Sequence, residues 1–193
     1  MTRLSSVQVI VVTNDEQERL IPLWVALRAE TGQTQQWAQR AARDGRIEAA
    51  IARSDVRIFL ASVEDADAGF AVVTRSPLSG LGDEQAAWID QMWVSPEHRG
   101  AGVARALLAK VSAFAEERGS TQLVCCVPAQ SRAVNRYFAR LGFTGVVTAR
   151  ATSTAALRRR LTGATETSGA ATVRMRRSLR ARSRDDVNVV GGL

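Results

Sequence analysis

The sequence has one histidine, His98, and only two cysteines. A single histidine excludes a metal site built from several histidines, and it makes a Ser-His-Asp triad improbable unless His98 itself takes part. Cys125 and Cys126 are adjacent, so in a strand their side chains point to opposite faces. We therefore expect two buried free thiols rather than a disulfide or a CxxC redox pair, and no metal site.

Long apolar runs are also missing. No stretch approaches the ~20 apolar residues that span a bilayer. Residues 1–8 lack the basic region and following apolar run of a secretory signal. We expect no membrane contact and a cytoplasmic location. The 193 residues, 46% apolar and 23% charged, are typical of one globular domain.

The net charge of +7 is unevenly placed along the chain. Residues 1–149 carry 16 basic and 16 acidic residues, whereas residues 150–193 carry 10 arginines and 3 acidic residues. We therefore expect a folded domain over 1–149 and an arginine-rich extension over 150–193, with a short helix and a partly flexible tail. The tail either packs or stays solvated, or it contacts an anionic partner such as nucleic acid. It lacks the interleaved aromatic residues that base stacking needs.

Hydrophobic periodicity predicts the element order β-α-α-β-β-β-α-β-α-β over the body of the chain. The expected strands are Val7–Thr13, Val56–Val63, Gly69–Arg75, Ala87–Ser95, Thr121–Val127 and Phe143–Thr148. The expected helices are Glu16–Thr31 with a start or kink at Pro22, Thr34–Arg53 with a possible break at Gly45, Gly102–Glu117, Gln130–Leu141 and Thr154–Leu161. Early hairpins and late strand–helix alternation indicate an α/β fold, a mixed central sheet with helices on both faces.

The strongest motif is WVSPEHRGAGVARALLAKV, residues 93–111. A strand ends at Val94 or Ser95, and a glycine-containing turn, Arg99–Ala104, leads into a helix. Glycines let the backbone turn tightly and bring N–H groups close to a ligand. The helix N-terminus adds unpaired donors and a partial positive charge, and Arg99 adds a full one. These features predict an anion cradle suited to a pyrophosphate.

Two other glycine motifs fail on particular residues. A P-loop needs Gly-Lys-Ser/Thr at its end, and none is present. A dinucleotide GxGxxG would place Arg105 at the third glycine, where a large residue prevents close helix–strand packing. It would also need an acidic residue near the end of the next strand, which ends Cys126-Val127-Pro128. A tight turn that binds nothing is the remaining alternative.

The chain resembles the GNAT acetyltransferase superfamily. Arg99, Gly102 and Ala104 match its Arg-x-x-Gly-x-Ala signature, and Val94-Ser95-Pro96 matches the run before it. A second match, Asn135 to Phe143, is similar to the family's helix that ends in Leu-Gly-Phe. The resemblance extends over residues 6–149 and implies an acyl-CoA N-acyltransferase fold.

The resemblance also implies a reaction. Acetyl-CoA would donate its acetyl group to a small-molecule or peptide amine that enters beside residues 16–53. The amine would attack directly, with a general base and a general acid. The implied cofactor contacts are the backbone of Met92, Trp93 and Val94 for pantetheine, the loop Arg99, Gly100, Ala101, Gly102, Val103 and Ala104 for the pyrophosphate, and Ser131 and Phe138 near the thiol. The protein would be a monomer or a homodimer.

The sequence departs from the family pattern at the catalytic positions. The family's frequent tyrosine acid falls at Phe138, and Tyr137 beside it lies ~100° away around a helix, so Tyr137 is either the acid or a packing residue. A common glutamate is replaced by Trp88. Asp90, expected on the same face as Trp88, is the candidate base, with a solvated strand carboxylate as the alternative and Glu84 as a weaker candidate. A common asparagine is replaced by Ser131.

Four tryptophans could form a cage for a cationic ligand. Trp24 and Trp37 lie on helical stripes and are expected in the core. Trp88 and Trp93 have opposite parity in their strand, which predicts that only one of them faces the cleft. Two other functions stay open: an acyl-CoA-binding regulatory module without catalysis, and a nucleic-acid- or ribosome-associated protein that uses the basic tail.

Overall fold

The computed structural model describes residues 6–77, 84–127, 131–145 and 151–162. The chain divides into two compact units, Met1–Arg136 and Tyr137–Leu193. The strands are β1 Val7–Val11, β2 Val56–Val63, β3 Ala66–Pro77, β4 Gln85–Val94 and β5 Gln122–Cys125. The helices are α1 Gln17–Glu30, α2 Gln35–Arg43, α3 Arg46–Ile51, α4 Val103–Glu117 and α5 Arg132–Arg140, and short 3-10 turns cover Asn14–Glu16 and Pro96–His98.

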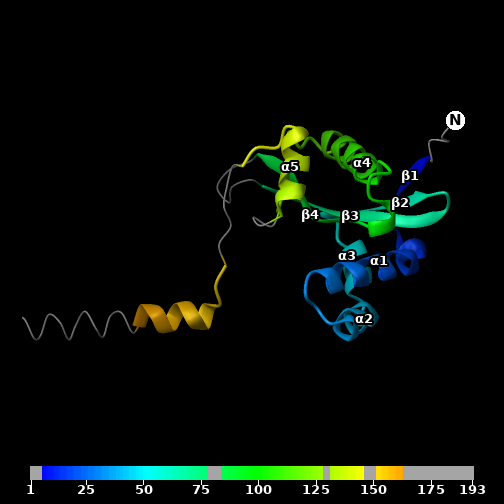
Figure 1. The fold of residues 1–193 in the computed structure, drawn as a ribbon. Coiled ribbons are helices and arrows are strands. Elements are labelled where there is room, and N and C mark those ends of the chain that lie inside the picture. The colour runs from blue at the N-terminus through cyan, green and yellow to red at the C-terminus, as the bar shows by residue number, and fades with distance from the viewer. Residues whose placement is uncertain (1–5, 78–83, 128–130, 146–150, 163–193) are drawn as a thin grey trace, which may run out of the picture. The chain divides into compact units, whose positions relative to one another are not determined.

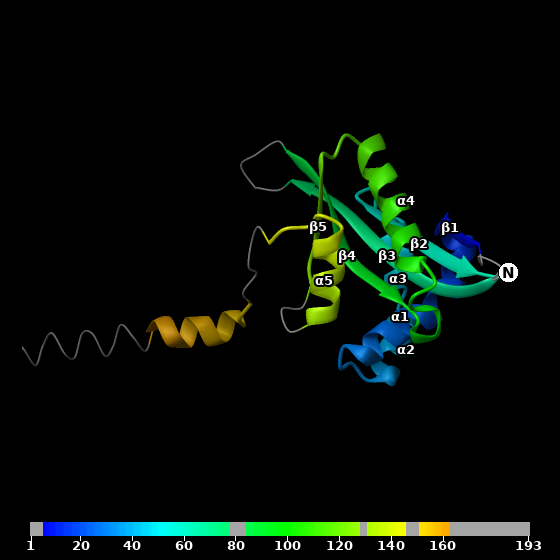
Figure 2. The ribbon, with the colours of Figure 1, turned by 45° about the horizontal axis from the view of Figure 1, so that its top comes forward.

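The first unit is built on one mixed sheet with the strand order β1-β2-β3-β4-β5. The pairings β1–β2, β2–β3 and β3–β4 are antiparallel, and β4–β5 is parallel. Helix α4 covers one face of the sheet, and α1, α2 and α3 lie on the other (Figure 1 and Figure 2). The expected α/β architecture with helices on both faces is confirmed.

The β2–β3 hairpin shows how local residues set this order. Glu64 and Asp65 form its turn with φ of 50° and 66°. Two positive φ values are the mark of the two-residue turn that matches strand twist. The acidic turn expected over Glu64–Ala68 is therefore shorter than predicted, and β3 begins at Ala66.

The face under α1–α3 is closed by small and large apolar residues together. Gly45 adopts a φ of 75° and separates α2 from α3, as its position predicted. Trp24 is buried with the alanines of α2, but Trp37 is 38% exposed, so the core position predicted for it is wrong. The buried stripe of α2 is Ala38, Ala41 and Ala42, which lets this helix approach closely. Trp37 instead lies beside Trp24, with the ring centroids 6.4 Å apart and the ring planes tilted by 33°.

The opposite face is closed by α4. Its buried side chains are Val103, Leu107, Leu108, Val111 and Ala115, at helical spacing. The ring of Phe114 meets that of Phe59 of β2 edge-on, with centroids 5.8 Å apart. The helix ends as predicted, because Gly119 takes a φ of 71° beyond its last turn.

The second unit has less described structure. Phe138 is buried, and its ring lies 5.0 Å from that of Phe143. Residues 143–145 are not in a strand, so the strand expected over Phe143–Thr148 does not begin where predicted, and its remainder lies outside the described residues. Residues 154–162 are helical as expected, with Leu157 and Leu161 exposed. The arginine-rich segment from residue 163 onward lies outside the described residues.

The cysteines and the helix lengths were also predicted from the sequence. Both cysteines are free, but Cys125 is half-buried and Cys126 is exposed, so the prediction of two buried thiols is wrong. The cause is that β5 ends at Cys125, which leaves Cys126 in the following segment. Among the described residues, no helix is both long and apolar enough to cross a membrane.

Candidate active site

Strand β4 has two halves that differ in their pairing. Ala86 to Ile89 pair with β5 on one side and with β3 on the other. From Gln91 to Val94 the described residues show pairing with β3 alone, and Asp90 lies between the two halves. The second half of β4, which we call the open edge, therefore offers backbone groups that no described strand uses. Unpaired strand edges are where an extended ligand can add hydrogen bonds.

A β-bulge marks the start of the open edge. Val72 pairs with Gln91 and Val73 pairs with Ile89, which leaves Asp90 without a partner in β3. One extra residue shifts the alternation of all side chains that follow it. The bulge therefore decides which β4 side chains face which helices.

The predicted opposite parity of Trp88 and Trp93 is wrong for this reason. Trp88 pairs with Thr74 and Trp93 with Phe70, four residues apart, so both lie on the face that carries α1–α3. Trp93 is buried there with its ring 6.5 Å from that of Phe70. Trp88 is half-buried, and its Nε1 donates to the Ser76 carbonyl oxygen at 3.3 Å.

The backbone groups of the open edge can be assigned from their contacts. The carbonyl oxygen of Val94 accepts a hydrogen bond from Arg99 Nε at 3.2 Å, so it points away from β3. Backbone groups alternate along a strand, which gives Met92 the same direction. Trp93 points the other way: a Cβ on Gly69 would lie 2.6 Å from its carbonyl oxygen. Of the three predicted pantetheine contacts, Met92 and Val94 fit and the Trp93 backbone does not.

The turn after β4 is fixed by short polar contacts. The Ser95 N–H donates to the Ala68 carbonyl oxygen of β3 at 2.9 Å. The Ser95 hydroxyl lies 3.0 Å from His98 Nδ1, and the His98 N–H donates back to the Ser95 carbonyl oxygen at 2.9 Å. These contacts hold the turn Pro96–His98 against the sheet and so fix where the following loop begins.

The loop itself has the form of a cradle. Gly100 and Gly102 have φ values of 87° and 85°, which favour glycine, and a Cβ at either position would meet nothing within 4 Å. The Ala106 N–H donates to the Gly102 carbonyl oxygen at 3.0 Å as α4 begins. The N–H groups of Val103 and Ala104 thus belong to the first turn, where helices leave donors unpaired. An exposed loop with such donors suits a phosphate.

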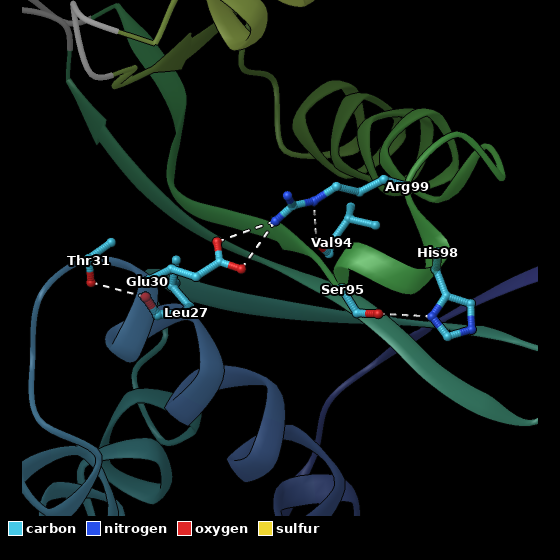
Figure 3. A network of polar contacts seen from close by, with 7 residues as sticks. All are labelled: Leu27, Glu30, Thr31, Val94, Ser95, His98 and Arg99. Atoms are coloured by element: carbon cyan, nitrogen blue, oxygen red, sulfur yellow. Dashed lines mark hydrogen bonds and ion pairs between the residues drawn. The ribbon is translucent and has the colours of Figure 1, made fainter.

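Arg99 lies at the start of this cradle and is already engaged. Its Nη2 contacts the two carboxylate oxygens of Glu30 at 3.2 and 3.3 Å. Figure 3 shows the Arg99 side chain extending past Val94 toward Glu30 at the end of α1. Glu30 was not among the residues predicted for the site. The available signal was an acidic residue at the last position of a helix, where the helix dipole disfavours negative charge.

Asp90, the candidate base, is exposed at the bulge. It lies near Arg53: the pKa of the Arg53 guanidinium is raised, mainly by its hydrogen bond with Asp55 and to a smaller extent by the charge of Asp90. Because bulges redirect a side chain at functional sites, the position suits a proton acceptor. The role itself stays a prediction.

The remaining predicted residues lie on or beside α5. Ser131 precedes the helix, and its carbonyl oxygen accepts from Asn135 Nδ2 at 2.9 Å. The Tyr137 ring meets that of Phe138 edge-on at 5.6 Å. The roles of Ser131, Tyr137 and Phe138 stay predictions.

Comparison with known proteins decides the family. The model of the acetyltransferase (GNAT) family matches residues 22–143. The chain belongs to the GNAT family. The protein is thus an acyltransferase, and the match includes the later part of α1, the whole of α2–α5, the open edge and the cradle. No curated protein matches the sequence significantly.

Solved structures share the fold at low sequence identity. A ribosomal-protein-alanine N-acetyltransferase from Brucella melitensis biovar Abortus 2308 has a TM-score of 0.61 and 20% identity, over 77% of this chain and 99% of that one. The aminoglycoside N-acetyltransferase AAC(6')-Iy in complex with CoA has a TM-score of 0.63 and 18% identity, over 79% and 99%. A transcriptional regulator from Bacillus halodurans C-125 reaches 0.63 at 16% identity, over 77% and 99%. These proteins are named for different functions, and the shared fold does not fix the acceptor.

Proposed function

We propose that this GNAT protein transfers the acetyl group of acetyl-CoA to a primary amine of a small molecule or peptide. The observation that carries the proposal is the junction of the open edge of β4 with the cradle at Arg99–Ala104. An extended pantetheine arm needs backbone partners, and a pyrophosphate needs N–H donors. Both kinds of group occur here in succession along one stretch of chain. We place this catalytic domain at residues 1–149, with residues 150–193 as its extension, and we expect the protein to act in the cytoplasm.

The assignments of individual residues follow from this geometry. The backbone of Met92 and Val94 would bind the pantetheine amides. The N–H groups of Gly100, Gly102, Val103 and Ala104 would bind the pyrophosphate, whereas the Ala101 N–H already donates to the His98 carbonyl oxygen at 3.3 Å. The Val103 side chain is buried as the first residue of α4. Ser131 and Phe138 are assigned to the thiol end of the cofactor.

The chemical step needs one proton acceptor and one proton donor. We assign the acceptor role to Asp90, which would take a proton from the ammonium of the substrate. The free amine attacks the thioester carbonyl carbon, the C–S bond breaks, and the departing thiolate takes a proton from Tyr137. The new amide nitrogen then loses its extra proton, which restores the Tyr137 phenol. Each such group contributes roughly 10²- to 10⁴-fold to a rate.

A second candidate function is an acyl-CoA-binding module without catalysis. It is favoured by Phe138 and Trp88, which stand where the family resemblance leads us to expect a proton donor and a glutamate. Neither side chain carries a titratable group. A third candidate, binding of nucleic acid or the ribosome through the tail, has only the arginine content of residues 150–193 in its favour.

Two measurements separate these functions. Calorimetric titration with acetyl-CoA comes first: binding is expected, and no heat at high micromolar ligand would contradict both CoA-dependent candidates. An acetylation screen with small amines, amino acids, aminoglycosides and protein N-termini comes second. Thiol release with one acceptor class supports the enzyme, whereas binding without turnover on any amine supports the module.

A further inference from the structure

The Glu30–Arg99 ion pair joins two parts of the protein that the proposed function treats separately. Glu30 is the last residue of α1, and Arg99 stands 69 residues later at the start of the cradle. The pair spans from the helical layer on one face of the sheet to the loop that precedes α4 on the other (Figure 3). A contact of this kind can link what happens in the cradle to α1.

Arg99 is engaged at two of its nitrogens in the free protein. Nη2 contacts both Glu30 oxygens, and Nε donates to the Val94 carbonyl oxygen at 3.2 Å. The second contact uses the backbone oxygen assigned above to the pantetheine arm. The first neutralises the charge that would attract the pyrophosphate. In the free protein, the Arg99 side chain therefore covers the Val94 carbonyl oxygen that pantetheine would use, and its own charge is paired with Glu30 instead of a phosphate.

The pair is also weak enough to open. The side chains of Arg99 and Glu30 are 56% and 44% exposed. Exposed ion pairs contribute little net free energy, because water screens them and ordering two long side chains costs entropy. A polyanionic ligand in the cradle could displace a single carboxylate from the guanidinium.

Glu30 stands at an unfavourable place for a carboxylate, and Arg99 is its ion-pair partner. A carboxylate in the last turn of a helix faces the negative end of the helix dipole. The Thr31 hydroxyl donates to the Leu27 and Arg28 carbonyl oxygens, whereas the Glu30 carboxylate accepts from Arg99. The position of Glu30 in the helix is therefore unfavourable for its charge, and its contact with Arg99 offsets that charge.

We propose that Glu30 sets the affinity for the cofactor by holding Arg99 across the open edge until the cofactor displaces it. The proposal rests on the proposed function, since it takes coenzyme A as the ligand of the cradle. If the cofactor binds only molecules in which Arg99 has left Glu30, the apparent Kd equals the intrinsic Kd divided by the fraction of such molecules. Removing the carboxylate should therefore tighten binding, by about threefold for a pair of this exposure.

The test is a calorimetric double-mutant cycle with coenzyme A as the probe. The variants are Glu30→Gln, Arg99→Gln and the double variant. The control is Glu97→Gln, which removes an exposed acid from the turn Pro96–His98, just before Arg99. Glu30→Gln is expected to lower the Kd about threefold, and Arg99→Gln to raise it. The double variant should match Arg99→Gln. Glu97→Gln should leave the Kd within a factor of about 1.5 of wild type. Thermal melts confirm that each variant folds.

The cycle can overturn the proposal in three ways. Weaker binding by Glu30→Gln would mean that the carboxylate orients Arg99 for the cofactor instead of holding it away. Equal tightening by Glu30→Gln and Glu97→Gln, or tightening that persists without Arg99, would reduce the effect to the loss of one negative charge. A wild-type protein that binds no coenzyme A would instead contradict the proposed function, and the inference would fall with it.

Discussion

The two halves of β4 belong to one strand but differ in how they pair with neighbouring strands. From Ala86 to Ile89 the strand is paired on both sides, and the side chains of Ala86, Ala87 and Ile89 are buried. From Gln91 to Val94 the described part of the chain shows pairing with β3 alone, and this half leads directly into the turn and the cradle. The bulge at Asp90 separates the halves. The difference shows that the strand continues past the bulge, whereas its pairing with β5 ends at Ile89 and leaves an edge open.

The largest effect is expected at the bulge itself. Asp90→Asn removes the candidate base without changing the shape of the side chain. Turnover at pH 7 should fall about 10²-fold or more, whereas the Kd for acetyl-CoA should stay near that of wild type. Steady-state kinetics with the acceptor found in the screen, together with calorimetry, measure both. The control is Asp44→Asn at the end of α2. An unaltered rate in Asp90→Asn would remove Asp90 from the mechanism.

The paired half should respond to mutation through stability. Ile89 is 3% exposed, so Ile89→Ala leaves a cavity and should lower the free energy of unfolding by about 2–4 kcal/mol. Met92→Ala, in the open half, removes a half-buried side chain and should cost less than half as much. Urea unfolding of both variants checks the difference. Equal losses would mean that the two halves are equally structural.

Gly69 should connect stability and binding. A Cβ there would lie 2.6 Å from the Trp93 carbonyl oxygen, 3.2 Å from Val94 Cα and 3.2 Å from Val103 Cγ1. Because two of these atoms are backbone, Gly69→Ala must displace the open half of β4, at about 1–3 kcal/mol. Affinity for acetyl-CoA should fall with it. A variant that loses stability and keeps wild-type affinity would show that the edge tolerates displacement.

The smallest effect is expected far from β4, at the start of the first helical segment. Thr13 and Glu16 form a capping box, and the hydrogen bond from the Thr13 hydroxyl lowers the pKa of Glu16. Stability from this carboxylate is therefore present at neutral pH and is lost as the pH falls below about 4.5. Tm profiles of wild type and Glu16→Gln should differ slightly at pH 7 and converge in acid, with acetyl-CoA affinity unaffected. A difference that grows in acid would contradict this account.

Local signals in the sequence were sufficient for most of the fold. β-Branched runs located the early strands, and Gly45 and Gly119 marked helix ends that the structure bears out. The cradle was predictable because glycines, the arginine and the helix start are consecutive in sequence. Such features depend on neighbouring residues alone.

What the sequence could not show depends on contacts across the sheet. The bulge at Asp90 arises from the register between β3 and β4, and no local pattern reveals it, so the faces of Trp88 and Trp93 were misjudged. Trp37 satisfies a helical stripe, but the alanines of α2 fill the space that it was expected to occupy. The partnership of Glu30 with Arg99 spans 69 residues and needed the fold to bring them together.

The central claim is that the cradle binds the cofactor's phosphates, and a pair of glycine variants tests it most directly. Gly102→Glu places bulk and negative charge in the cradle, whereas Gly119→Glu places the same residue at the opposite end of α4. Both glycines have positive φ and open space around them, so the backbone strain is matched. In calorimetric titrations with acetyl-CoA, Gly102→Glu should abolish binding and Gly119→Glu should bind as wild type does. Unchanged affinity in Gly102→Glu would contradict the account.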